Sequence, residues 1–91
     1  MSKIIVEHNP DPERLNKLGV HSWSTWAKEV SVFPWTYSEQ EVAYVLEGEV
    51  VVTPRGGEPV SFGAGDLVTF PSGMACTWEV RKALRKHYRF G

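Results

Sequence analysis

Cysteine is nearly absent from this chain of 91 residues, which contains Cys76 and no other. A single cysteine cannot form an internal disulfide. Small secreted domains usually carry several disulfides, so we expect a cytoplasmic protein. Long hydrophobic runs are also missing. The longest covers residues 42–46, and the first residues contain only three consecutive apolar side chains. These runs are too short for a membrane span or a signal peptide, so we expect no membrane partner.

The chain has no excess of positive charge. Ten Lys and Arg residues face eleven Asp and Glu residues, giving a net charge of −1, and we therefore expect no nucleic-acid partner. The charges are nevertheless segregated, because residues 81–91 hold five of the basic side chains and no acid. We interpret this segment as a final strand whose solvent-exposed face complements an acidic body. A phosphate or nucleic-acid patch is the alternative.

Apolar residues make up 42% of the chain and aromatic residues 12%, with four Trp among them. This composition and length predict one globular domain over residues 1–91. Near the start, Asp11 and Pro12 are typical of a helix N-terminus and Gly19 of a helix end, which predicts a short helix over residues 11–18. Leu15 and Leu18 would share its buried face.

Short apolar segments separated by glycine dominate the rest of the sequence. They are rich in Val, Phe, Tyr and Thr and lie at residues 42–46, 49–53, 59–62, 67–70, 75–80 and 83–90. Short strands with regular glycine and proline turns indicate an antiparallel sandwich or barrel. We therefore predict an all-β fold, with a β-barrel over residues 20–90 and one short N-terminal helix.

Two motifs resemble those of the cupin superfamily. Glu41 is followed after six residues by Gly48, and Gly65 is followed by Pro71, Gly73 and, at the motif's final position, Cys76. The chain looks most like small cupins related to the cupin domain of ureidoglycine aminohydrolase and to the ethanolamine-utilisation cupin. The resemblance implies a double-stranded β-helix, or jelly-roll barrel. Because strand residues alternate between faces, an inward Glu41 implies inward Ala43 and Val45, and an inward Cys76 implies inward Trp78 and Val80.

The same resemblance implies metal-ligand positions, most of which carry other residues here. Trp35, Tyr37 and Cys76 stand where metal-binding cupins have histidine, and Glu41 keeps a ligand type. A transition-metal site needs three or four convergent donors, so we expect no metal cofactor. The alternative is that Glu41, Cys76 and an inward-facing His87 approach one another closely enough to hold a metal.

Aromatic side chains would then surround Glu41. The predicted ligand-binding residues are Trp26, Trp35, Tyr37, Glu41, Cys76 and Trp78, and the predicted catalytic residues are Glu41, Tyr37 and His87. Glu41 could act as a general acid and base, or it could bind a cation together with the aromatic faces. The alternative is a barrel filled by its own side chains.

Three function classes remain open at this point. The chain could be a metal-independent enzyme that acts on a small polar metabolite with a nitrogenous or carbonyl group. It could instead be a non-catalytic module that binds such a ligand. The third possibility is a structural barrel. Whether it is an enzyme is left undecided. Because sheet edges invite pairing, we also expect a homodimer, with Trp23 and Trp26 in the contact.

Overall fold

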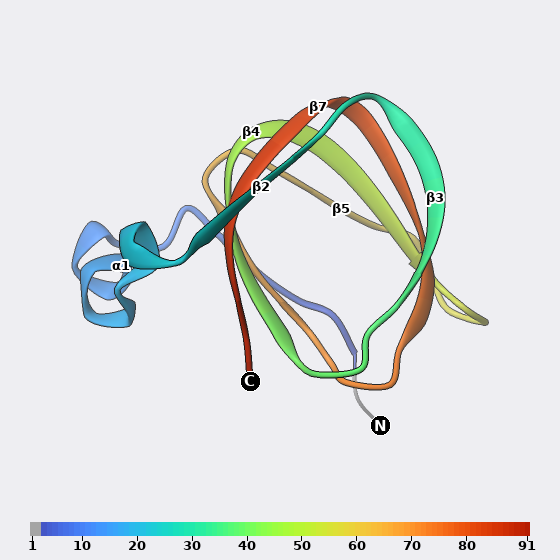
Figure 1. The fold of residues 1–91 in the computed structure, drawn as a ribbon, viewed down its shortest axis with the longest axis horizontal. Coiled ribbons are helices and arrows are strands. Elements are labelled where there is room, and N and C mark those ends of the chain that lie inside the picture. The colour runs from blue at the N-terminus through green and yellow to red at the C-terminus, as the bar shows by residue number, and fades with distance from the viewer. Residues whose placement is uncertain (1–2) are drawn as a thin grey trace.

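β-Strands account for most of the chain in the computed structural model, which describes residues 3–91 (Figure 1). The strands are β1 Ile5–His8, β2 Ser24–Lys28, β3 Ser31–Thr36, β4 Glu41–Pro54, β5 Val60–Gly63, β6 Asp66–Phe70 and β7 Ala75–Phe90. The helix α1 covers Pro12–Leu18, and one turn of 3-10 helix, η1, covers Val20–Ser22. The fold is therefore all-β with one short N-terminal helix, as the sequence predicted.

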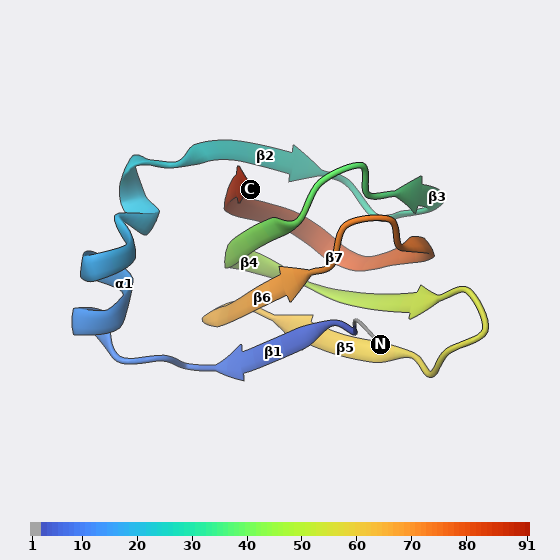
Figure 2. The ribbon, with the colours of Figure 1, turned by 90° about the horizontal axis from the view of Figure 1, so that it is seen from below.

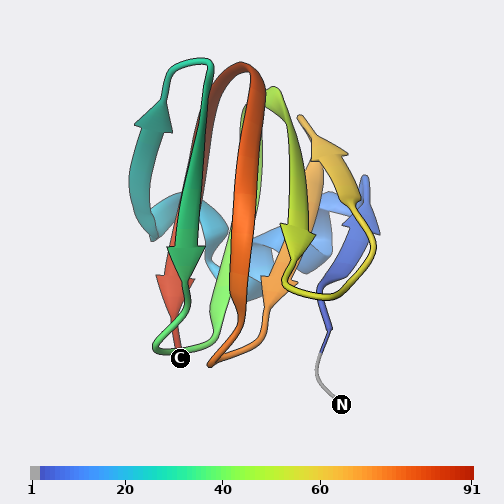
Figure 3. The ribbon, with the colours of Figure 1, turned by 90° about the vertical axis from the view of Figure 1, so that its right-hand side faces the viewer.

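Two long strands, β4 and β7, pair with each other along the wall of the barrel, and the other strands pair on either side of them or with their neighbours (Figures 1 and 3). The first half of β7 pairs with β3, and its second half pairs with β2. β4 pairs with β6 near its beginning and with β5 near its end. Each long strand thus belongs to both layers of the jelly roll. The segments at residues 42–46 and 49–53 are one strand rather than two, as are those at residues 75–80 and 83–90.

The bend of β4 lies at Gly48, between irregularities in its pairing with β7. Gly48 has φ of 112°, and a Cβ at this position would lie 2.7 Å from the carbonyl oxygen of Ala83. Both observations require glycine, because a side chain would be strained by the backbone and would clash with β7. The first motif therefore ends in a glycine that allows the backbones of β4 and β7 to approach each other closely.

The N-terminal helix lies against the outer face of the barrel, at one end (Figure 2). Pro12 begins α1, and Gly19 ends it in the left-handed conformation with φ of 71°, as predicted. Leu15 packs in a small cluster with Val20 and Leu67, and Leu18 lies beside it. Asp11 occupies the N-cap position, but its side chain makes no capping hydrogen bond. Within residues 3–91, no helix has the length and hydrophobicity that crossing a membrane requires.

Strand β1 was not anticipated from the sequence. It pairs antiparallel with β6, placing His8 opposite Asp66. The Asp66 carboxylate accepts a hydrogen bond from the Gly63 backbone N–H at 2.9 Å and lies 3.0 Å from His8 Nδ1. The turn before Asp66 is thus held by local hydrogen bonds, and the same carboxylate contacts β1.

The interior of the barrel follows the predicted alternation. Glu41, Ala43 and Val45 of β4 are all buried, and so are Trp78 and Val80 of β7. Exposed side chains of the last strand form ion pairs with β4, namely Arg85 with Glu47 at 3.7 Å and Lys82 with Glu49 at 3.6 Å. This agrees with a solvent-exposed basic face beside acidic residues. Lys86 is the exception, because it is buried.

Candidate small-molecule binding site

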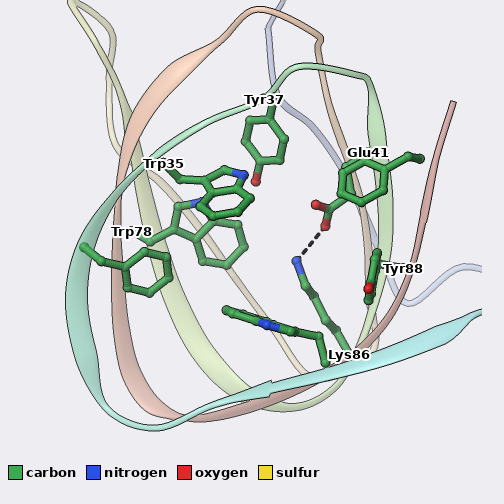
Figure 4. A pocket seen from close by; sticks show the side chains of 9 residues that line it. Trp35, Tyr37, Glu41, Trp78, Lys86 and Tyr88 are labelled. Carbon is green, nitrogen blue, oxygen red and sulfur yellow. Dashed lines mark hydrogen bonds and ion pairs between the residues drawn. The ribbon is translucent and has the colours of Figure 1, made fainter.

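A cavity of about 220 Å³ lies inside the barrel, between β2, β3, β4 and β7 (Figure 4). Its walls are mainly aromatic rings. The lining residues are Trp26, Phe33, Trp35, Tyr37, Glu41, Trp78, Lys86, Tyr88 and Phe90. Trp35 and Phe90 are about half exposed, at 47% and 45%, so the cavity has an aromatic rim that reaches solvent. The barrel is therefore not completely filled by its own side chains.

Glu41 and Lys86 form an ion pair in this cavity. Lys86 Nζ donates to Glu41 Oε2 at 2.6 Å, and the exposed fractions of the two side chains are 6% and 5% (Figure 4). Glu41 begins β4, and Lys86 lies on the second half of β7, which runs beside it. A buried charge is tolerated when a partner of opposite charge is close, so each side chain permits the burial of the other.

Aromatic rings surround the ammonium group of Lys86. Its Nζ lies 4.7 Å from the centroid of Trp78, 5.1 Å from that of Trp26 and 5.8 Å from that of Tyr88. Cation–π attraction stabilises the charge at these distances. Burial nevertheless lowers the pKa of Lys86, and the negative charge of Glu41 opposes that shift only in part. The site thus holds an amine that gives up its proton more readily than a surface lysine does.

Two further polar atoms, which belong to residues that line the cavity, have no hydrogen-bond partner among the described residues. They are Tyr37 Oη and Trp78 Nε1, and their side chains are almost completely buried. Figure 4 shows the Tyr37 hydroxyl directed toward Glu41 and Lys86. Burial raises the pKa of Tyr37, and the negative charge of Glu41 adds to the effect, so this hydroxyl keeps its proton. Both atoms are therefore donors that lack an acceptor among the described residues.

The structure brings together five of the six predicted ligand-binding residues. They are Trp26, Trp35, Tyr37, Glu41 and Trp78. Cys76 does not line the cavity, although it lies on the same face of β7 as Trp78. Its Sγ is directed to the backbone carbonyl of Trp35 at 3.6 Å, and burial raises the pKa of the thiol. A thiol in this setting is a packed group rather than an activated nucleophile.

His87 also lies outside the cavity, which corrects its prediction as a catalytic residue beside Glu41. Strand alternation places Lys86 inside the barrel, so its neighbour His87 faces outward. His87 Nδ1 lies 3.3 Å from the carbonyl oxygen of Trp23, and its ring packs edge-on against His21. His87 thus joins β7 to the segment that follows α1, and it is not among the residues that line the cavity.

Sequence reasoning missed four residues of the cavity: Phe33, Lys86, Tyr88 and Phe90. The alternation of Leu84, Lys86, Tyr88 and Phe90 along the last strand contained the signal for three of them. An apolar face that includes a lysine indicates an inward lysine if an acid faces it. The basic composition of residues 81–91 instead favoured a solvent-exposed position for every charge.

The side chains present do not fit the metal site of other cupins. Within residues 3–91, no group of three or more His, Cys, Asp or Glu side chains is placed to hold a metal ion. Glu41, the one ligand type kept in the motifs, already binds the ammonium group of Lys86. An amine thus supplies the positive charge beside this carboxylate.

The two-layered barrel and its interior cavity define a small single-barrel cupin. The chain belongs to the family of EutQ-like cupin domains, whose family model matches residues 15–88. Among curated proteins, no significant match to the chain is found.

Similar solved structures include a DUF861 family protein from Thermotoga maritima. It is 45% identical, has a TM-score of 0.95, and the match covers 98% of this chain and 100% of that chain. A putative ethanolamine utilization protein Q from Salmonella typhimurium is 30% identical, with a TM-score of 0.66, and the match covers 72% of this chain and 53% of that one. The Clostridium difficile EutQ protein is 26% identical, also with a TM-score of 0.66, and the match covers 72% of this chain and 52% of that one. The matched region is thus about half the length of these two EutQ proteins.

Proposed function

We propose that the chain binds a small polar metabolite in the aromatic cavity, using the Glu41–Lys86 ion pair to recognise its polar group and the surrounding rings to hold its apolar part. The observation that carries this proposal is the ion pair itself, which is buried yet lines an open space of about 220 Å³. A purely structural core would gain more from apolar side chains, because a buried ion pair is often no more stabilising than hydrophobic residues of similar volume.

Two features of the cavity support binding over a merely structural role. Its volume is well above the roughly 10–15 Å³ that one water molecule needs. Two donors, Tyr37 Oη and Trp78 Nε1, lack partners, and each buried unsatisfied group costs about 1–3 kcal/mol. A ligand that accepts hydrogen bonds from them would recover this free energy. An apolar cavity with a few convergent polar groups is the usual form of a small-molecule site.

The relatives favour a nitrogenous or carbonyl-bearing metabolite. One of the similar structures is named as a putative ethanolamine utilization protein, and this chain shares its cupin domain. Catalysis by Glu41 with Tyr37 is the enzymatic form of the proposal, and binding without chemistry is the alternative. In both forms the site works without a metal, because an amine takes the place of a metal ion beside Glu41.

A binding screen with matched variants tests the proposal. The wild-type chain would be titrated with small amines, aldehydes, amides and carboxylates while the indole N–H signals are followed by NMR. We expect saturable shifts of Trp26 and Trp78 with at least one class, lost in Glu41→Gln. The control Glu49→Gln removes an exposed carboxylate on the same strand and should bind normally. No saturable shift with any class would refute the proposal.

Two measurements separate the remaining alternatives. Turnover of the ligand that is lost in Glu41→Gln would identify an enzyme, whereas binding without turnover would identify a binding module. Elemental analysis of the purified protein tests metal independence, since stoichiometric zinc, manganese, iron or nickel would contradict it.

A further inference from the structure

Lys86 presents its amine to the cavity in a setting that differs from that of an ordinary lysine. Within residues 3–91, no other lysine lines this space. Its Nζ contacts a carboxylate oxygen at 2.6 Å and is otherwise surrounded by the rings of Trp26, Trp78, Tyr88 and Phe70. The amine is therefore held in one place, screened from bulk water, and next to a group that can accept and return a proton.

These three conditions are those of a nucleophilic lysine. An amine attacks a carbonyl carbon only in its neutral form, and a desolvated site in an apolar pocket is a common way to make that form available. The lowered pKa of Lys86, caused by burial, is consistent with this geometry. Glu41 is close enough to take the proton directly, without an intervening water.

We propose that Lys86 reacts with a small uncharged aldehyde or ketone to form an imine in this cavity, with Glu41 transferring the protons. The inference rests on the proposed binding function of the same site and names its ligand class. A carbonyl oxygen is a hydrogen-bond acceptor, which is what the unpartnered donors Tyr37 Oη and Trp78 Nε1 require.

The reaction balances without any further reactant. Glu41 removes one proton from the ammonium group, and the nitrogen electron pair forms a bond to the carbonyl carbon. The carbonyl oxygen takes this proton from Glu41, and a second proton follows the same route from nitrogen to oxygen. The C–O bond then breaks, water leaves, and a C=N bond remains. The iminium nitrogen keeps one proton and its positive charge beside the Glu41 carboxylate, so the ion pair persists in the product.

The cavity also limits which carbonyl compounds fit. The one cation that lines it is already paired with Glu41, so among the described residues no free cation remains there to bind the carboxylate of a keto acid. Its walls are the faces and edges of aromatic rings, including Phe33 stacked at 6.0 Å on Trp78. A short alkyl or planar group would pack against these rings. The site is therefore suited to compact, uncharged aldehydes and ketones.

Reductive trapping tests the proposal on the unmodified chain. The protein would be incubated with butanal and sodium cyanoborohydride at about pH 6, where surface lysines are almost fully protonated, and the alkylated lysines mapped by peptide mass spectrometry. We expect Lys86 to be labelled at least several-fold above Lys82, an exposed lysine on the same strand, because the lowered pKa of Lys86 leaves more of its amine neutral. Glu41→Gln should slow the labelling of Lys86, and Glu49→Gln should not.

NMR titration with butanal alone distinguishes imine formation at Lys86 from ligand binding in the cavity. Saturable shifts of the Trp26 and Trp78 indole signals, with Lys86 labelled no more than Lys82, would overturn imine formation and leave the binding function intact. If no carbonyl compound binds but another ligand class does, the carbonyl assignment alone fails. If nothing binds and Lys86 is unlabelled, both the imine and the binding site are refuted. Because the labelling uses the wild-type chain, these outcomes do not depend on a variant that folds.

Discussion

The ammonium group of Lys86 lies 4.7 Å from the ring centroid of Trp78, whose indole N–H has no hydrogen-bond partner among the described residues. A positive charge and an unused donor thus share one region of the cavity wall. Both attract an electron-rich atom, and the nearby Tyr37 hydroxyl adds a third donor. These polar groups belong to residues of a cavity whose lining is mostly aromatic.

Lys86→Met is expected to destabilise the fold strongly. Methionine keeps the length and apolar contacts of the lysine but leaves the Glu41 carboxylate buried and unpaired, which costs about 3–5 kcal/mol. Urea unfolding measures the loss. The control Lys82→Met removes an exposed ion pair and should change stability by about 1 kcal/mol or less.

The double variant Glu41→Gln with Lys86→Met shows whether the instability of Lys86→Met comes from the unpaired Glu41 carboxylate. It removes both charges, so most of the stability lost in Lys86→Met should return. A double variant as unstable as Lys86→Met would show that the methionine disrupts packing and that the ion pair is not the cause.

The contribution of Lys86 to stability is expected to increase with pH in the alkaline range. Burial lowers the pKa of Lys86 in the folded chain below its usual 10.5. Between these two pKa values the unfolded chain binds more protons than the folded one, so the free energy of unfolding rises with pH. Below the folded pKa, the cost of burying the ammonium group is present in full.

This pH effect is best measured as the difference in free energy of unfolding between wild type and Lys86→Met. Tyr37 and Cys76, whose pKa values burial raises, lower stability as pH rises, and they do so in both wild type and Lys86→Met. The stability of wild type relative to Lys86→Met should therefore increase as the pH rises from the lowered pKa of Lys86 toward its usual 10.5. A constant difference across this range in urea unfolding at several pH values would contradict the prediction.

Tyr37→Phe is expected to stabilise the unliganded protein and weaken binding. The variant removes a buried hydroxyl without a partner, so the free energy of unfolding should rise by about 1–3 kcal/mol, while the stacked ring at 4.9 Å from Phe70 is kept. Thermal unfolding and titration with the ligand found by screening measure the two effects. A less stable variant would indicate that the hydroxyl has a partner in solution, such as a bound water.

Gly48→Ala should be among the most damaging substitutions outside the cavity. The added Cβ would meet the backbone of Ala83 and Leu84 at 2.7 and 2.9 Å, and the residue has φ of 112°. Strain of this kind costs about 1–3 kcal/mol from the backbone conformation alone. Gly56→Ala is the matched control, because φ is also positive there and no atom lies within 4 Å of the added Cβ.

A homodimer remains a prediction for this chain. The two Trp residues expected at the contact have roles within the chain, since Trp23 lies beneath Arg89 at 5.3 Å and Trp26 lines the cavity. Sedimentation at micromolar concentration should give the mass of two chains. A single species with the mass of one chain would refute the dimer.

The sequence alone determined most of the β-segments, the helix ends and which residues of a strand share a face with Glu41. These features depend on local chemistry: the alternation of side chains along a strand, the conformational freedom of Gly19 and Gly48, and the fixed φ of Pro12. Each can be read from residues that are neighbours in the chain. The resemblance of the two motifs then placed these elements in a cupin barrel.

Only the tertiary structure decided which charges are buried and which partners they meet. Glu41 and Lys86 are 45 positions apart, and their contact depends on the register between β4 and β7. A lysine next to other basic residues is normally exposed, because burying an ammonium group without a partner is unfavourable. The partner exists only once the two strands pair, and the same register turns His87 outward. The charge that defines the cavity is therefore a property of the folded chain, because the free energy of burying it depends on a contact between distant residues.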